Sequence, residues 1–97
     1  MALGTLWTER AIAHLEAELE YYAKIHTKLA AELTQLVNDA VEKIIHSPGI
    51  GRPGKRLGTR EFVLSQYPHI LAYRERNNVL EILAFIHQKR KNIQSYY

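Results

Sequence analysis

The 97-residue sequence contains no cysteine, and it has only five glycines and three prolines. The absence of cysteine excludes a disulfide scaffold and every thiolate metal site. Because no run of about 18 apolar residues is present, we expect no transmembrane helix. The first ten residues lack a basic segment followed by a long apolar one, so we expect no secretory signal. These absences favour a cytoplasmic protein.

The residues that are present are typical of one small folded domain. Hydrophobic residues make up 46% of the chain and charged residues 24%, which argues against disorder. A chain of this length has room for a single thin core. We therefore assign residues 1–97 to one domain.

Charge is distributed unevenly along the chain. Residues 1–51 contain four lysines and arginines against seven acidic residues, a net charge of −3. Residues 52–97 contain nine against three, a net charge of +6. The basic half is suited to a polyanion or to an acidic protein partner. The alternative is a solvated surface with uneven charge and no partner.

The first half of the chain predicts a strand followed by two helices. Residues 2–7 are a short strand candidate, and Thr8 is a suitable N-cap. Apolar residues then recur every three or four positions, as on one face of a helix. A single helix over this span would be about 57 Å long, which is too long for a chain of this size. We therefore predict an antiparallel helical hairpin, with helices at about 9–25 and 28–46 and Thr27 as the second N-cap.

The second half predicts a loop and three strands. Four of the five glycines and two of the three prolines fall in the loop 47–59, and no helix or central strand tolerates such a segment. Its Gly51–Gly54 part lacks the sequence context of a phosphate-binding loop, and we interpret it as a rigid turn. Asn77–Asn78 is a tight-turn signal between two strands. The predicted strands and the basic tail lie at about 60–65, 69–75, 79–87 and 88–97.

Together these elements predict an α+β fold, in which an N-terminal strand and a helical hairpin pack on one face of a small antiparallel sheet. Tyr67 and Tyr73 lie among apolar residues, so we expect them to pack in the core or at the sheet edge. The five histidines are scattered along the sequence. We therefore expect no metal site, and we expect no cofactor.

Five sequence blocks follow one another in a characteristic order: Trp7 ahead of a helix, the loop Ser47–Gly54, the segment Gly58–Glu61, and the strands Tyr67–Arg74 and Val79–His87. Together they resemble the RelE/ParE superfamily of bacterial toxins, in its ParE-like branch. The resemblance covers almost the whole chain and implies the strand, helical hairpin and antiparallel sheet of that fold. It also implies the toxin of a type II toxin–antitoxin module, neutralised by a cognate antitoxin and serving plasmid stabilisation.

Two activities occur in this superfamily: RelE-type members cut messenger RNA on the ribosome, and ParE-type members inhibit DNA gyrase. Metal-free RNA cleavage needs an acid–base group and cations around the phosphate. The candidates here are His87, Arg74, Arg60 and Arg90. The structural alternative for His87 is a strand-end histidine that bonds to the backbone. The structural alternative for Arg60 and Arg74 is a cross-strand ion pair with a glutamate.

The sequence departs from the ribonuclease branch at three matched positions. That branch often has a loop glutamate, a strand arginine and a C-terminal aromatic residue, where this chain has Gly54, Ile70 and Gln88. Because neither Gly54 nor Ile70 can carry charge, the resemblance favours gyrase inhibition, by a protein without chemistry of its own. A ribosome-dependent endoribonuclease is the alternative, and a non-toxic regulator that binds antitoxin or operator DNA is the third interpretation.

The expected partners are a cognate antitoxin, in a hetero-oligomer, and DNA gyrase as the target. The ribosome with its messenger RNA is the alternative target, and we expect no membrane partner. An acidic, apolar antitoxin segment would suit the basic half of this chain, and free sheet edges invite an added strand. The candidate contact residues for target or antitoxin are Arg60, Arg74, His87, Lys89, Arg90, Lys91, Tyr96 and Tyr97.

Overall fold

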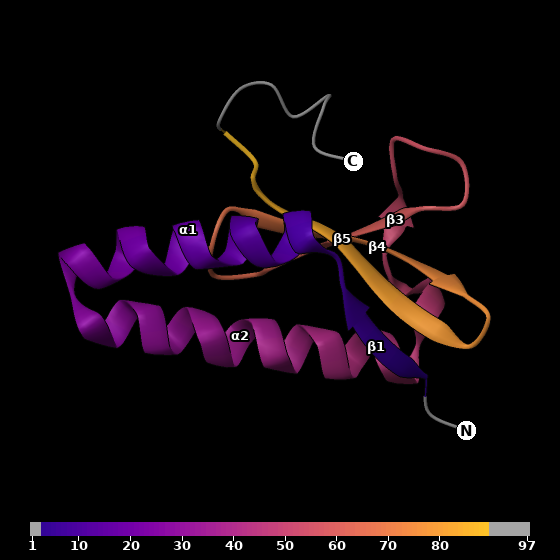
Figure 1. The fold of residues 1–97 in the computed structure, drawn as a ribbon, viewed down its shortest axis with the longest axis horizontal. Helices are drawn as coiled ribbons and strands as arrows, with labels where there is room; N and C mark the ends of the chain where they lie inside the picture. The colour runs from indigo at the N-terminus through magenta and orange to yellow at the C-terminus, as the bar shows by residue number, and fades with distance from the viewer. Residues whose placement is uncertain (1–2, 90–97) are drawn as a thin grey trace.

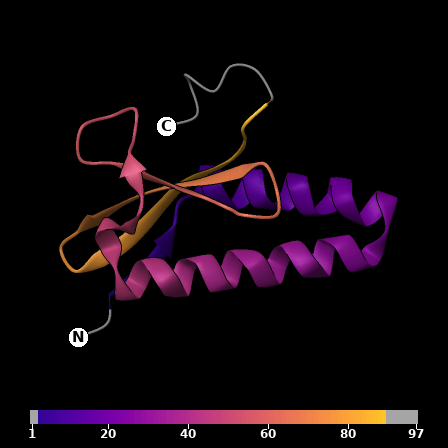
Figure 2. The same ribbon diagram turned by 180° about the vertical axis from the view of Figure 1, so that it is seen from behind.

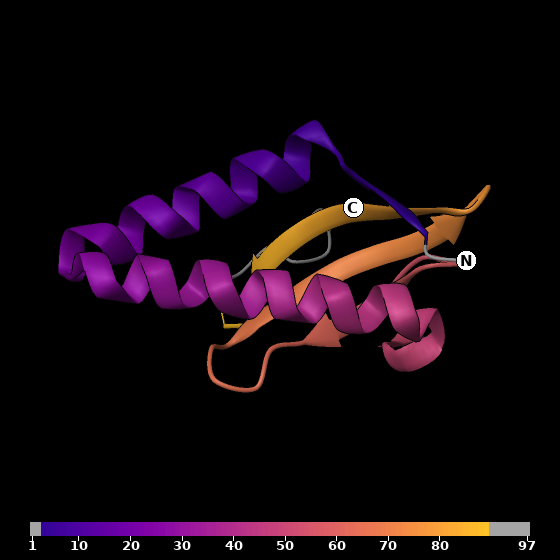
Figure 3. The same ribbon diagram turned by 90° about the horizontal axis from the view of Figure 1, so that it is seen from below.

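A computed structural model describes residues 3–89, which form two helices packed on one face of a five-stranded sheet (Figure 1). The views from behind and from below show the same arrangement, with both helices on one face of the sheet (Figures 2 and 3). The predicted α+β fold is therefore confirmed. No helix among the described residues is long and apolar enough to cross a membrane. In chain order the elements are β1 (Gly4–Trp7), α1 (Glu9–Ile25), α2 (Thr27–His46), the 3-10 turn η1 (Pro48–Ile50), β2 (Arg52–Pro53), β3 (Arg60–Val63), β4 (His69–Arg76) and β5 (Val79–His87).

The sheet has the strand order β1-β5-β4-β3-β2, so the first strand lies beside the last. β1 runs parallel to β5, with Trp7 opposite Ile82, and the other neighbours are antiparallel. The long connection that a parallel pairing requires is the rest of the fold, since the helical hairpin and β2–β4 all lie between β1 and β5 in the chain. The β4–β5 turn has Asn77 and Asn78 at φ 54° and 62°, in the left-handed region that asparagine tolerates.

The two helices are separated by one residue in extended conformation. His26 has φ −168° and ψ 129°, and its ring Nδ1 accepts the Lys28 backbone N–H at 3.1 Å. The N-cap of α2 is therefore His26, and the predicted cap Thr27 is the first helical residue. The N-cap predicted for α1 is confirmed, since the Thr8 hydroxyl oxygen accepts the Ala11 backbone N–H at 3.1 Å.

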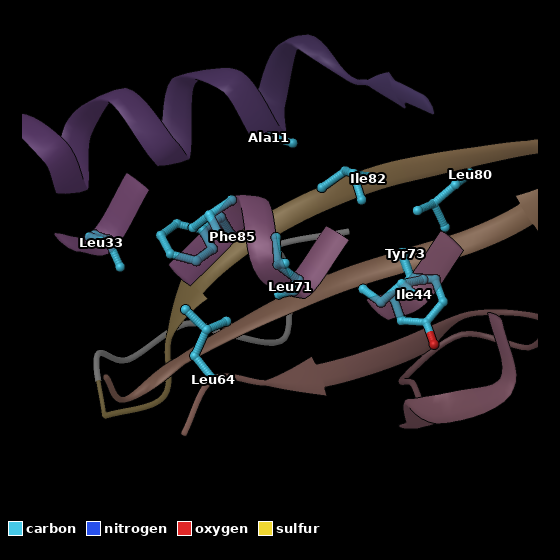
Figure 4. Close-up of a cluster of buried hydrophobic side chains, with 11 residues drawn as sticks. Ala11, Leu33, Ile44, Leu64, Leu71, Tyr73, Leu80, Ile82 and Phe85 are labelled. Atoms are coloured by element: carbon cyan, nitrogen blue, oxygen red, sulfur yellow. The ribbon is translucent and has the colours of Figure 1, made fainter. Parts of the chain in front are cut away.

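The main core lies between the helical hairpin and the sheet (Figure 4). Leu33 and Ile44 of α2 face Leu71, Tyr73 and Phe85 of β4 and β5, and all of these side chains are buried. Each large apolar side chain removed from water contributes about 1.5–3 kcal/mol, which is why this layer holds the hairpin on the sheet. The packing predicted for Tyr73 is confirmed.

The other face of the sheet carries a smaller apolar cluster. Ala72 of β4 lies opposite Ala84 of β5, and Leu83 and Ile86 pack against this pair. A break in the β4–β5 register lies between Ala72 and Tyr73. The two fully buried residues of this cluster are alanines, whereas those of the helix-covered face include leucine, isoleucine, tyrosine and phenylalanine.

The segment 47–59 has more structure than the predicted loop. It contains the turn η1 and the two-residue strand β2, in which Pro53 pairs with Arg60 at the sheet edge. An edge strand accepts proline because it needs hydrogen bonds on one side only. β3 ends at Val63 where the sequence predicts a strand to 65, and Tyr67 lies in the loop after β3 and not within a strand.

Candidate functional site

The two candidate arginines Arg60 and Arg74 lie around one pocket of about 200 Å³. β3 begins at Arg60, which pairs with Tyr73, so β4 continues past the start of its neighbour. The pocket lies beside the part of β4 that extends past the start of β3. Its described lining residues are Pro48, Gly49, Gly58, Arg60, Tyr73, Arg74 and Glu75.

A hydrogen-bond network fixes Arg60 at the pocket wall. Arg60 Nη1 donates to the Gly51 carbonyl oxygen at 2.8 Å. The Gly51 N–H donates to the Tyr73 hydroxyl at 2.9 Å, and that hydroxyl donates to the Pro48 carbonyl at 2.7 Å. Burial raises the pKa of Tyr73, so the hydroxyl keeps its donor proton. The network links the turn η1, β3 and β4 into one rigid wall.

Arg74 is fixed from the neighbouring strand β5, by a cross-strand ion pair with Glu81. Its side chain remains 37% exposed, and a pair at such a surface contributes only about 0–1 kcal/mol. The structural role that the sequence offers for Arg74, a cross-strand ion pair with a glutamate, is therefore found. For Arg60 the contact is the Gly51 carbonyl, and the neighbouring Glu61 pairs with Arg52 at 3.0 Å.

His87 lies at the far end of β5, opposite His69. It lies six positions along β5 from Glu81, the partner of Arg74, which is about 20 Å of strand. The ring Nδ1 of His87 accepts the Lys89 backbone N–H at 3.1 Å, the backbone contact that the sequence offers as the structural alternative. The described residues thus do not bring His87 together with Arg60 and Arg74. Lys89 ends the described chain, and Arg90, Lys91, Tyr96 and Tyr97 lie outside the described residues.

A buried histidine–carboxylate pair, which sequence reasoning missed, connects α1 to the sheet. His69 Nε2 lies 2.8 Å from Glu18 Oε1, and both residues are buried. The His69 ring stacks on Phe85 with a centroid distance of 4.7 Å and meets the His87 ring edge-on at 5.1 Å. Glu18 and His69 are 51 positions apart, so no local sequence pattern could have indicated the pair.

His14 belongs to the same region of α1. Its Nδ1 accepts the Phe85 backbone N–H at 3.3 Å, and burial, with a contribution from Arg10, lowers its pKa. A neutral ring is therefore favoured, as the accepted hydrogen bond requires. Within residues 3–89, no three histidine or carboxylate side chains cluster in a way that could hold a metal ion.

Comparison with known proteins gives three similarities. The model of the family described as "ParE toxin of type II toxin-antitoxin system, parDE" matches residues 5–92. The candidate toxin Y4kP of Sinorhizobium fredii is 37% identical over 81 residues, which cover 84% of this chain and 83% of that protein. A solved chain from the chromosomal ParDE toxin–antitoxin system of P. aeruginosa superposes with a TM-score of 0.78 at 24% identity, covering 89% of this chain and 96% of that one. The last similarity shows the fold.

Proposed function

Because this chain belongs to the ParE family of type II toxin–antitoxin toxins, we propose that it inhibits DNA gyrase and that a cognate antitoxin neutralises it. Such a target implies action in the cytoplasm. The observation that carries the proposal is the pocket of Arg60 and Arg74, which stands about 20 Å of strand away from His87. Two positioned cations that are separated from His87, the acid–base candidate, suit a protein contact better than RNA cleavage.

The geometry of the pocket favours binding to an acidic protein surface. Arg60 is held by Gly51, and Arg74 by Glu81, before any partner arrives. Ordering long side chains costs about 0.5–1.5 kcal/mol each on binding, so arginines fixed in advance reduce that cost. The guanidinium groups are suited to carboxylates because they donate two parallel hydrogen bonds.

For the antitoxin, we propose the groove between α2 and β3. Phe62 and Leu64 line this hollow of about 130 Å³ together with Leu36 and Ala40 of α2. β2 pairs only with Arg60 and Glu61, so the outer edge of β3 beyond them carries no strand within the described part of the chain. An extended antitoxin segment can add to this edge and place apolar side chains in the groove.

Pulse-labelling after controlled expression without antitoxin tests the target. DNA and protein synthesis are followed separately in the first minutes, and inhibition of supercoiling is measured with purified gyrase. We expect thymidine incorporation to fall first and Arg74→Ala to weaken inhibition, while Arg76→Ala, an exposed arginine two residues along β4, retains it. An early fall in methionine incorporation would instead identify a ribosome-directed ribonuclease. Absence of any toxicity would identify a non-toxic regulator.

A further inference from the structure

The tip between β2 and β3, Gly54–Gly58, is an exposed basic feature of the described chain. Lys55 and Arg56 are both exposed, and the tip contains no acidic residue. Leu57 follows them with a relative exposure of 104%, against 57% for Ile25, the next most exposed large hydrophobic residue. A fully exposed leucine beside two cations is an unusual combination, because burial of a leucine is favourable by about 1.5–3 kcal/mol.

The tip is held in shape by hydrogen bonds across its base. The Gly54 N–H donates to the Thr59 carbonyl at 2.8 Å, and the Thr59 N–H donates to the Arg56 carbonyl at 3.1 Å. The buried Thr59 hydroxyl also donates to the Arg56 carbonyl. Gly58 has φ +83°, which lets the chain turn back without strain. Leu57 is therefore presented by a fixed backbone and not by a loose loop.

Positive charge continues from the tip along both of its sides. One hollow beside it is lined by Arg10 and Arg56 with Thr8 and Leu83, and the other by Arg52 and Lys55 with Glu61. Glu61 is buried and paired with Arg52, so it offsets the charge of that arginine. Residues 47–89 carry seven lysines and arginines against three acids, whereas acidic residues outnumber basic ones in the helices.

We propose that this tip is a contact for double-stranded DNA, in which Lys55 and Arg56 bind backbone phosphates and Leu57 enters the minor groove. Apolar wedges flanked by arginine and lysine are a known means of minor-groove binding. A single-stranded ligand would call for aromatic stacking platforms, and the tip has none. A protein partner would call for a cluster of apolar anchors, whereas Leu57 is the only large hydrophobic residue of the tip. The inference does not depend on gyrase being the target.

The phosphate contacts are tested by fluorescence anisotropy of the full chain with a labelled duplex of about 20 base pairs, at about 50 to 200 mM salt. We expect Lys55→Ala/Arg56→Ala to weaken binding and to lower the slope of log K against log salt by about 2. The control Lys24→Ala/Lys28→Ala removes equal charge at the α1–α2 turn, at the opposite end of the molecule (Figure 1). Absence of duplex binding, or equal losses in both double variants, would overturn the inference.

The wedge is tested separately with a duplex labelled at both ends. We expect the unmodified chain to shorten the end-to-end distance by bending the DNA, and Leu57→Ser to abolish that bend while the salt slope stays unchanged. Equal bending by Leu57→Ser would refute the role of Leu57. Both measurements mix the chain with a DNA duplex in the absence of gyrase. A chain that inhibits gyrase but does not bind the duplex would therefore contradict this inference without contradicting the proposed target.

Discussion

At the scale of single residues, Gly51 is a glycine whose surroundings leave no room for a side chain. A Cβ atom there would lie 2.7 Å from the Tyr73 hydroxyl oxygen and 2.9 Å from the Glu61 carbonyl oxygen. We expect Gly51→Ala to lower the free energy of unfolding by about 1–3 kcal/mol, because the alanine displaces the network that holds Arg60. Urea denaturation followed by circular dichroism measures this change.

The matched control for that substitution is Gly49→Ala. Nothing lies within 4 Å of a Cβ at Gly49, so its stability should be unchanged or rise by about 0.4–1 kcal/mol through the unfolded chain. If the two alanine variants unfolded at the same urea concentration, the crowding at Gly51 would have no energetic weight. If only Gly51→Ala lowered the free energy of unfolding, the packing of the pocket wall would be shown to require glycine at this position.

The candidate residues could be identified from the sequence, but which of them lie together in space could not. Arg60 and Arg74 belong to recognisable blocks, and both line the pocket. Their distance from His87 depends on which residues of β4 and β5 pair, and strand register is set by the packed face and turn geometry. The Glu18–His69 pair joins residues 51 positions apart, and no local pattern indicates such a contact.

At the scale of elements, the helix break depends on one side chain. His26 caps α2 through its ring Nδ1, and α1 and α2 are joined without glycine or proline. We expect His26→Ala to lower the free energy of unfolding by about 0.5–2 kcal/mol, since the Lys28 N–H loses its acceptor. His26→Asn supplies another capping acceptor and should retain most of the stability. Equal losses in chemical denaturation of the two variants would argue against the cap.

The longer elements were predictable because each carries a repeated pattern. The helices show apolar residues every three or four positions, and β5 is a nearly continuous apolar run. The position of the break was not predictable, because histidine is a weak capping signal compared with the adjacent Thr27. β2 has only two residues and contains a proline, so its pairing comes from the tertiary fold and leaves no periodic signal.

At the scale of the whole molecule, the groove of α2 and β3 gives a test of antitoxin binding. Val63 lines the groove and is 39% exposed, so a lysine there can be solvated in the free chain. We expect Val63→Lys to reduce co-purification with the neighbouring gene's product by at least roughly tenfold, since a charge buried at an interface costs several kcal/mol. Pull-down from co-expressing cells measures the loss.

The control for that variant is Ile50→Lys, which places the same charge on another half-exposed apolar residue, in the turn η1. The Ile50→Lys variant should still co-purify with the neighbouring gene's product. Equal retention by Val63→Lys and Ile50→Lys would move the antitoxin interface away from the groove, and circular dichroism of both variants separates a lost contact from a lost fold.

The pairing of β1 with β5 has a consequence for synthesis of the chain. Trp7 pairs with Ile82 in the sheet, so β1 has no neighbour until β5 has been made. Contacts of such long sequence separation form late and slowly. The helical hairpin can assemble early from local contacts, but the sheet that carries Arg60 and Arg74 is complete only after β5 has been made. A nascent chain therefore keeps β1 unpaired while every element between β1 and β5 is synthesised.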